Sequence, residues 1–178
     1  MKESYLYKKL KDKKVQCQTC AHRCFISPEK FGICGVRKNI DGILYALNYG
    51  RAISLSIDPI EKKPYFHFLP GSHSLSIATV GCNLSCGNCQ NWQISQVVKK
   101  DESMLDIGQN INPEEIVAEA IRSECPSISY TYTEPTIFLE YALDTMKLAR
   151  EKKIKNSWVT NGFMSNETLD LISPYLDA

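Results

Sequence analysis

The feature that most constrains the fold of this chain is a regular alternation of strand-like and helix-like segments after residue 73. The predicted strands are short and rich in apolar and β-branched residues, and they cover residues 74–80, 128–133 and 157–160. Segments with apolar residues at helical spacing follow them, one after Asn112 and the others over residues 136–152 and 166–172. Asn112, Pro113 and Glu115 form a strong helix-start signal, with an N-cap, a first-turn proline and a capping box. Strands that alternate with helices favour right-handed βαβ units and a parallel sheet, so the expected fold class is α/β.

Three strand–helix units are too few to close a barrel. A complete (β/α)8 barrel has about 250 residues, or roughly 30 for each unit, and this chain has 178. The chain ends where the next strand would begin. We therefore expect residues 74–178 to form about half of a (β/α) barrel, and the chain to be an N-terminal fragment of a longer protein.

The organisation of the sequence is different before residue 74, and we expect residues 1–73 to form a small Cys-rich, metal-binding domain with short strands. Strand-like runs cover residues 43–49 and 52–57. The lysine-rich segment at residues 8–14 is expected to be the solvated face of a helix. Two prolines in residues 58–64 indicate a loop, because proline interrupts strand pairing, and the two lysines between them are expected to be exposed.

Charge and hydropathy argue against two classes of function. The formal net charge is +1 at pH 7, whereas proteins that bind nucleic acids or acidic membranes show a strong basic excess. The N-terminus lacks the apolar core of a signal peptide, and no later run approaches the ~20 apolar residues of a membrane span. We therefore expect a cytoplasmic protein that binds neither nucleic acid nor membrane.

The chain contains eight cysteines, and seven of them fall into two groups. The first group is Cys17, Cys20, Cys24 and Cys34, and the second is Cys82, Cys86 and Cys89. Cytosolic thiols are kept reduced, so clustered cysteines in a cytoplasmic protein are more often metal ligands or redox centres than disulfides. The remaining cysteine, Cys125, is expected to be a small buried apolar side chain.

The second group has the spacing C-x3-C-x2-C and follows the first predicted strand of the half barrel directly. Iron–sulfur clusters are held by cysteine thiolates. Three thiolates on a four-iron cluster leave one iron with an open position, much as a catalytic zinc keeps one position for its substrate. The loop also lies where barrel enzymes have their active sites. From the spacing alone, the alternative is a structural zinc site that is completed by a distant fourth ligand.

This three-cysteine pattern in this position resembles the radical SAM superfamily, and the resemblance covers residues 74–178. It implies that the three thiolates bind a [4Fe–4S] cluster whose fourth iron binds S-adenosylmethionine (SAM). It further implies reductive cleavage of SAM to methionine and a 5′-deoxyadenosyl radical, which abstracts hydrogen from a substrate. The radical chemistry belongs to the cofactors, and the protein positions and shields them.

Two further motifs agree with the resemblance. Thr133-Glu134-Pro135 follows the second strand, where the superfamily often has Gly-Gly-Glu; Glu134 would bind the amino group of SAM, with Thr133 beside it. Thr160-Asn161-Gly162 follows the third strand and resembles the T-N-G of pyruvate formate-lyase activating enzymes, which makes Asn161 a cofactor-binding candidate. Each motif taken alone is more commonly a helix cap or a turn.

One position departs from the superfamily pattern. An aromatic residue usually precedes the third cysteine and lies beside the adenine, but here this residue is Asn88. Trp92 is close enough to replace it, and a core tryptophan is the alternative interpretation. Asn88 and Trp92 are therefore both candidate cofactor-binding residues.

A wider set of segments resembles the AmmeMemoRadiSam-system radical SAM proteins, which are relatives of the pyruvate formate-lyase activating enzymes. The set comprises Cys17-x2-Cys20-Ala-His-Arg-Cys24, Phe31-Gly-Ile-Cys-Gly-Val-Arg37, Tyr49-Gly50, Asp58-Pro-Ile-Glu-Lys-Lys-Pro64, His67-Phe68 and Cys89-Gln-Asn-Trp92. This resemblance implies Memo-like and AMMECR-type proteins as partners and an electron donor such as flavodoxin or ferredoxin. It does not name a substrate.

The first cysteine group has the spacing C-x2-C-x3-C-x9-C. Four thiolates fill a tetrahedral site, and a closed site of this type is usually structural zinc, which would also stabilise a segment too small for its own core. An auxiliary iron–sulfur cluster is the alternative. His22 could replace one of the cysteines as a ligand, but a solvent-facing position or a position beside the site is expected.

Two classes of function remain. The first is a radical SAM enzyme that acts on an unidentified substrate, with a glycyl-radical-enzyme activating enzyme of the pyruvate formate-lyase activase type as its more specific form. The second is a non-catalytic zinc-binding interaction module. The two classes differ in metal content, because only the enzyme needs iron, sulfide and SAM.

Overall fold

The main sheet of the computed structural model, which describes residues 1–178, has four strands in the order β12-β11-β9-β8. They are β8 (Ser54–Pro59), β9 (His73–Ala78), β11 (Ser127–Tyr130) and β12 (Lys155–Trp158). The last three are parallel, and β8 pairs with β9 in the antiparallel direction. The expected α/β class and the three parallel strands are confirmed.

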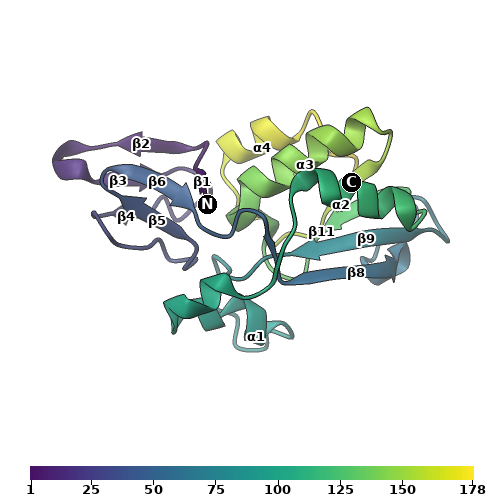
Figure 1. The fold of residues 1–178 in the computed structure, drawn as a ribbon, viewed down its shortest axis with the longest axis horizontal. Helices are drawn as coiled ribbons and strands as arrows, with labels where there is room; N and C mark the ends of the chain where they lie inside the picture. Colours follow the sequence, from purple (N-terminus) through teal and green to yellow (C-terminus); the bar gives the residue numbers. More distant parts are fainter.

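The helices that follow the parallel strands lie on one face of this sheet (Figure 1). They are α2 (Pro113–Arg122), α3 (Leu139–Glu151) and α4 (Asn166–Ile172). Leu75, Ile77, Ile128 and Tyr130 of the strands form one buried apolar cluster with helix residues such as Met146. Alternate positions of the same strands are serines, and Ser129 is hydrogen-bonded to both Ser74 (2.7 Å) and Ser157 (2.8 Å). One face of the sheet is therefore apolar and the other is polar.

The predicted helix starts follow local capping chemistry. The Asn112 side chain accepts from the Glu115 N–H at 2.8 Å, and the Glu115 carboxylate accepts from the Asn112 N–H at 2.7 Å, which confirms the capping box. The predicted helix 136–152 instead begins as a 3-10 turn (η5, Pro135–Phe138) that continues into α3. α4 has the predicted bounds and begins after Ser165, whose hydroxyl accepts from the Thr168 N–H.

The N-terminal part consists of short strands, which form a lobe beside the main sheet (Figure 1). One sheet contains β1 (Lys2–Glu3), β6 (Ile43–Ala46) and β5 (Arg37–Ile40), and the other β2 (Tyr7–Lys9), β3 (Val15–Cys17) and β4 (Phe25–Ile26). The predicted lysine-rich helix at residues 8–14 is wrong. Its residues form β2, a 3-10 turn (η1, Lys11–Lys13) and the start of β3, because Val15 and Cys17 are buried with the two-residue period of a strand.

The main sheet draws on residues from both sides of the expected boundary after residue 73, since β8 precedes it and β9 begins at His73. The predicted loop at residues 58–64 begins later than expected. Asp58 and Pro59 still belong to β8, which is an edge strand and therefore tolerates proline, and a 3-10 turn (η2, Ile60–Lys62) follows.

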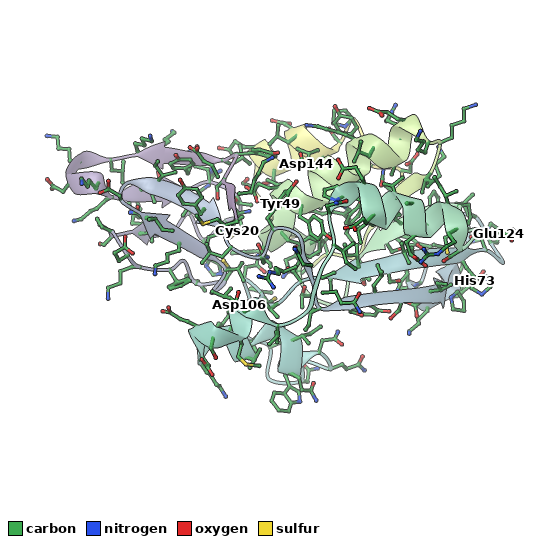
Figure 2. The ribbon with its side chains drawn as sticks, in the orientation of Figure 1. Cys20, Tyr49, His73, Asp106, Glu124 and Asp144 are labelled. Atoms are coloured by element: carbon green, nitrogen blue, oxygen red, sulfur yellow. The ribbon has the colours of Figure 1, made fainter.

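A buried ion pair joins the N-terminal part to the helices. The Arg37 guanidinium donates to both oxygens of Glu140 in α3, at 2.9 and 2.7 Å, and to the Ser4 hydroxyl at 2.7 Å. Both charged side chains are at most 2% exposed. Nearby, the Tyr49 hydroxyl donates to Asp144 of α3 at 2.8 Å, and Figure 2 shows these two residues beside each other where the lobe meets the helices.

The remaining elements are short and lie between β9 and α2 or beside β8. They are α1 (Trp92–Ser95), η3 (Val97–Lys99), η4 (Glu102–Asp106), β7 (Arg51–Ala52) and β10 (Gln109–Asn110), the last two of which pair with each other. None of the helices combines the length and the apolar sequence that crossing a lipid bilayer requires.

Candidate functional site

The loops that follow β9, β11 and β12 meet at the carboxyl ends of the three parallel strands. They surround an open hollow with a volume of about 180 Å³. Six residues predicted from the sequence line it: Cys82, Cys86, Cys89, Thr133, Glu134 and Asn161. Three segments that are distant in the sequence therefore contribute to one site, at the edge of a parallel sheet where ligands commonly bind.

The three-cysteine loop, residues 81–91, holds its thiols in different environments. Cys86 is exposed, while Cys82 and Cys89 are partly buried. Burial raises the pKa of the Cys82 thiol, and the Leu84 N–H, which donates to its sulfur at 3.5 Å, opposes that rise. The Cys89 sulfur lies 3.4 Å from the Ser95 hydroxyl. Each of these polar groups would stabilise a thiolate.

A lysine that sequence reasoning missed supports this loop from outside the hollow. The Lys99 ammonium donates to the Leu84 carbonyl at 2.9 Å and to the Ser85 hydroxyl at 3.0 Å. Partial burial lowers the pKa of Lys99, and the nearby thiols, Cys82 first among them, act in the opposite direction. Lys99 thus places a positive charge beside the three cysteines.

The Glu134 carboxylate connects the second and third loops. Its Oε1 accepts from the Thr136 N–H (3.1 Å), the Thr136 hydroxyl (2.5 Å) and the Thr160 hydroxyl (2.7 Å), and its Oε2 accepts from the Asn161 N–H at 2.7 Å. The side chain is buried. Glu134 is therefore the cap of the η5 turn, as its motif taken alone suggests, and at the same time a wall of the hollow.

Two asparagines that sequence reasoning missed connect the three-cysteine loop to the other loops. The Asn91 amide donates to the Tyr132 carbonyl at 2.8 Å, and Tyr132 has a positive φ of 63°. The Asn83 side-chain oxygen accepts from the Asn161 amide at 3.0 Å. Short polar residues in a cysteine-rich loop have no periodicity, so the sequence offers no signal for either contact.

Asn88 and Trp92 do not line the hollow. Both are exposed, and Trp92 is 58% exposed in the first turn of α1. The alternative of a core tryptophan is therefore wrong. Their predicted contact with an adenine stays a prediction, which would require a cofactor that extends out of the hollow over α1.

Comparison with known proteins identifies the family. The model of the radical SAM superfamily matches residues 76–177, which is more than half of the chain. The chain belongs to the radical SAM superfamily. Members of this superfamily cleave SAM with the help of a [4Fe–4S] cluster, and the match covers all three loops around the hollow.

Two similar proteins are longer than this chain. The uncharacterized protein MJ0808 of Methanocaldococcus jannaschii is 49% identical over 169 residues, which are 95% of this chain and 50% of that protein. The uncharacterized protein MJ0674 of the same organism is 26% identical over 164 residues, 90% of this chain and 43% of that protein. The chain therefore spans about half the length of the curated relatives it matches. No solved structure matches the chain significantly.

The thiols that line the hollow are the kind and number of ligands that the superfamily's [4Fe–4S] cluster requires. No group of three or more His, Cys, Asp or Glu side chains is arranged to hold a metal ion as it stands. However, three thiols on one loop face the hollow and no fourth thiol does, and a volume of about 180 Å³ exceeds the space of a single ion. Three thiols without a fourth match the donor set that the superfamily's cluster needs, because one of its irons must stay open to SAM.

The four cysteines of the first group line a second, much smaller cavity, which we call the four-thiol cavity. Its volume is about 10 Å³, and its walls also include His22, Arg37 and Asn83. Burial raises the pKa of the Cys34 thiol to about 11. His22 lies beside the thiols as expected, where its Nε2 donates to the Asn83 carbonyl at 2.8 Å. The cavity thus directly adjoins the three-cysteine loop.

A polar network around Asp58 of β8 reaches the hollow through the Tyr132 side chain, which is the member of the network that lines it. Asp58 accepts from Lys62 at 2.6 Å, from Lys63 at 2.8 Å and from Ser76 at 2.6 Å, and the Tyr132 hydroxyl also donates to it. Burial acts to raise the pKa of Asp58, but these donors outweigh it and hold the pKa well below its usual value. The expected exposure of both lysines is correct for Lys62, which is 58% exposed, and wrong for Lys63, which is only 3% exposed.

Proposed function

We propose that this chain is the cofactor-binding part of a radical SAM enzyme that abstracts hydrogen from an unidentified substrate. The observation that supports it is the convergence of the three-cysteine loop, Glu134 and Asn161 on one hollow, within a region that matches the superfamily. A cluster held there would supply one electron to the sulfonium of SAM, which breaks into methionine and a 5′-deoxyadenosyl radical. The half-barrel architecture is part of this proposal, with the remaining strands in the part of the relatives that lies beyond this chain.

Different residues of the hollow would hold the cluster and bind SAM. Cys82, Cys86 and Cys89 would hold three irons. Glu134 would bind the amino group of SAM, because a carboxylate has about four acceptor directions, and Oε2, which accepts only from the Asn161 N–H, retains one for an ammonium. Tyr132, which lines the hollow, would be held in place by its hydrogen bond to Asp58, which Lys63 in turn fixes, so that this wall is not mobile.

The finer assignment to the AmmeMemoRadiSam proteins, with a glycyl-radical activating enzyme as a second form, rests on the motif resemblance. The same holds for a flavodoxin or ferredoxin as electron donor and for Memo-like and AMMECR-type partners. The structure adds one supporting observation for the activating-enzyme form. The Thr160-Asn161-Gly162 motif, which resembles those enzymes, contacts Glu134 through both Thr160 and Asn161.

The test is anaerobic reconstitution with iron and sulfide, followed by assay of 5′-deoxyadenosine release from SAM under a strong reductant. We expect a brown protein that releases 5′-deoxyadenosine, and a Cys86→Ala variant that loses this cluster and the activity. Cys125→Ala is the matched control, since Cys125 is buried away from both cysteine groups. A colourless protein that holds only zinc and leaves SAM intact would instead support the non-catalytic module.

Substrate turnover requires a further comparison, because the chain covers only half of its relatives. A protein extended to the length of MJ0808 should couple more hydrogen abstraction to each SAM cleaved, since additional barrel strands would shield the radical. Equal coupling in the short and extended proteins would contradict the half-barrel part of the proposal.

A further inference from the structure

Two buried N–H groups beside the four-thiol cavity have no hydrogen-bond acceptor. They are the Arg37 Nε and the Asn83 Nδ2, and both residues line the cavity. Arg37 is 2% exposed and Asn83 is 1% exposed. Buried donors in native proteins nearly always have a partner, and an orphaned one indicates a missing ion, water or ligand atom. The two terminal nitrogens of Arg37 already donate to Glu140 and Ser4.

We propose that Cys17, Cys20, Cys24 and Cys34 bind one zinc ion as thiolates, and that Arg37 Nε and Asn83 Nδ2 donate to the ligand sulfurs. Four thiolates on Zn²⁺ have a net charge of −2, so that sulfurs in this site attract N–H donors from the surrounding protein. The buried Arg37 guanidinium offsets part of that charge. One centre thus accounts for four clustered thiols and two orphaned donors.

The size of the cavity favours a single ion over an auxiliary iron–sulfur cluster. A volume of about 10 Å³ corresponds to roughly one water-sized sphere, whereas a cubane of four irons and four sulfides needs several times that space. The backbone around the cavity is also held in place. The Cys17 N–H donates to the Cys24 carbonyl at 2.9 Å, and Cys20 forms a β-bridge with Met164. The thiols are not yet arranged to hold an ion, so binding would turn their side chains inward.

The proposed zinc centre would also position the three-cysteine loop, since Asn83, whose amide would donate to a zinc ligand, directly follows Cys82. The Asn83 carbonyl accepts from His22 at 2.8 Å, its side-chain oxygen accepts from Asn161 at 3.0 Å, and its free amide faces the thiols. Figure 2 shows Cys20 where the N-terminal lobe meets the rest of the chain. Zinc binding itself is independent of the proposed function, and only this positioning role rests on it.

The first experiment measures the metal content of the reconstituted protein. We expect about one zinc per chain in addition to one [4Fe–4S] cluster, and visible absorption bands of a tetrahedral tetrathiolate site when Co²⁺ replaces zinc. Cys34→Ser should lose the zinc, and the control Cys125→Ser should keep it. Zinc-free protein with a second cluster's iron and sulfide, or an octahedral Co²⁺ spectrum, would overturn the proposal.

The second experiment tests the donors without removing a ligand. Asn83→Asp keeps the oxygen that accepts from Asn161 but replaces the N–H donor by a negative charge, and we expect zinc to pass to a chelator about 10–100-fold faster. The control Asn91→Asp changes an asparagine of the same loop whose amide donates to the Tyr132 carbonyl, outside the four-thiol cavity. Equal rates in the two variants would refute the role of Asn83.

The third experiment tests the positioning role by a spectroscopic signal. The change that SAM causes in the electron paramagnetic resonance spectrum of the reduced cluster should weaken in zinc-depleted protein and return when zinc is added back. An unchanged response would overturn the positioning role. A protein that retains zinc but neither binds nor cleaves SAM would refute the proposed function alone, and one that cleaves SAM without ever binding zinc would refute only the zinc centre.

Discussion

The close approach between Gly81 and the Cys34 segment predicts that Gly81→Ala is strongly destabilising. Gly81 begins the three-cysteine loop and has φ +95°. A Cβ at this position would lie 2.6 Å from Val36 Cγ1 and 2.8 Å from the Cys34 carbonyl oxygen. Both distances are shorter than van der Waals contact, and one of the two atoms is backbone. The substitution therefore changes both backbone strain and packing.

Two glycines of the same chain separate these effects. Gly71 has φ +76°, and no atom lies within 4 Å of the point that an added methyl group would occupy; Gly87 has neither a positive φ nor a neighbour within 4 Å. We expect alanine at a positive φ to lower the free energy of unfolding by about 1–2 kcal/mol. The overpacked contact should lower it by a further ~1–3 kcal/mol. Gly87→Ala should thus be nearly neutral, Gly71→Ala should cost only the first contribution, and Gly81→Ala should cost both.

The assay is anaerobic urea and thermal unfolding of the three variants at equal metal content. An additional 2 kcal/mol corresponds to a decrease of roughly 4–8 °C in the melting temperature of a protein of this size. Gly81→Ala should also lower cluster content, because the displaced residue is adjacent to Cys82. A Gly81→Ala variant that is no less stable than Gly71→Ala would show that the two cysteine segments are not packed as described.

Three further predictions concern charged side chains. Glu134→Gln should weaken SAM binding about tenfold, the loss of one charge-assisted hydrogen bond, as measured by calorimetry with the exposed Glu114→Gln as control. Arg37→Met should lower the free energy of unfolding by about 3–5 kcal/mol, because it leaves Glu140 buried and unpaired, and urea unfolding of the Arg37→Met, Glu140→Leu double variant should recover part of the loss. Asp58→Asn should destabilise the protein at pH 7 but much less in acid. The folded state lowers the pKa of Asp58 from 3.8, so its contribution is complete above about pH 4 and is lost as the pH falls through the lower value; a gap between wild type and variant that is constant from pH 7 to pH 3 would contradict this.

The parts of the fold that were predicted correctly depend on short-range chemistry. The α2 capping box involves residues three positions apart, and the α4 start depends on Ser165 and Thr168. The lysine-rich segment was misassigned because its charges are compatible with any solvated element. The informative signal was the alternate burial of Val15 and Cys17, which only becomes visible once neighbouring strands pair with them.

The site was predictable to the extent that it follows the strand order. Loops after consecutive parallel strands must meet at one edge of the sheet, so the grouping of the three cysteines with Glu134 and Asn161 followed from the element assignment. Asn83 was not predictable in this way. Its partners His22 and Asn161 are 61 and 78 residues away, so its contacts form only when the N-terminal lobe and the third loop both pack against the three-cysteine loop.

Glu134 shows why a local interpretation and a functional one need not compete. As the cap of η5, its Oε1 accepts from the N–H and the hydroxyl of Thr136, and this contact directs the carboxylate away from its own backbone toward the third loop. There, the Thr160 hydroxyl donates to Oε1 and the Asn161 N–H donates to Oε2, so that Oε2 keeps one further acceptor direction free. The capping hydrogen bonds thus restrict the Glu134 side chain to one orientation, because a glutamate without them would populate several rotamers. A helix-cap signal at the end of a parallel strand is therefore compatible with the proposed ligand-binding role of the same carboxylate.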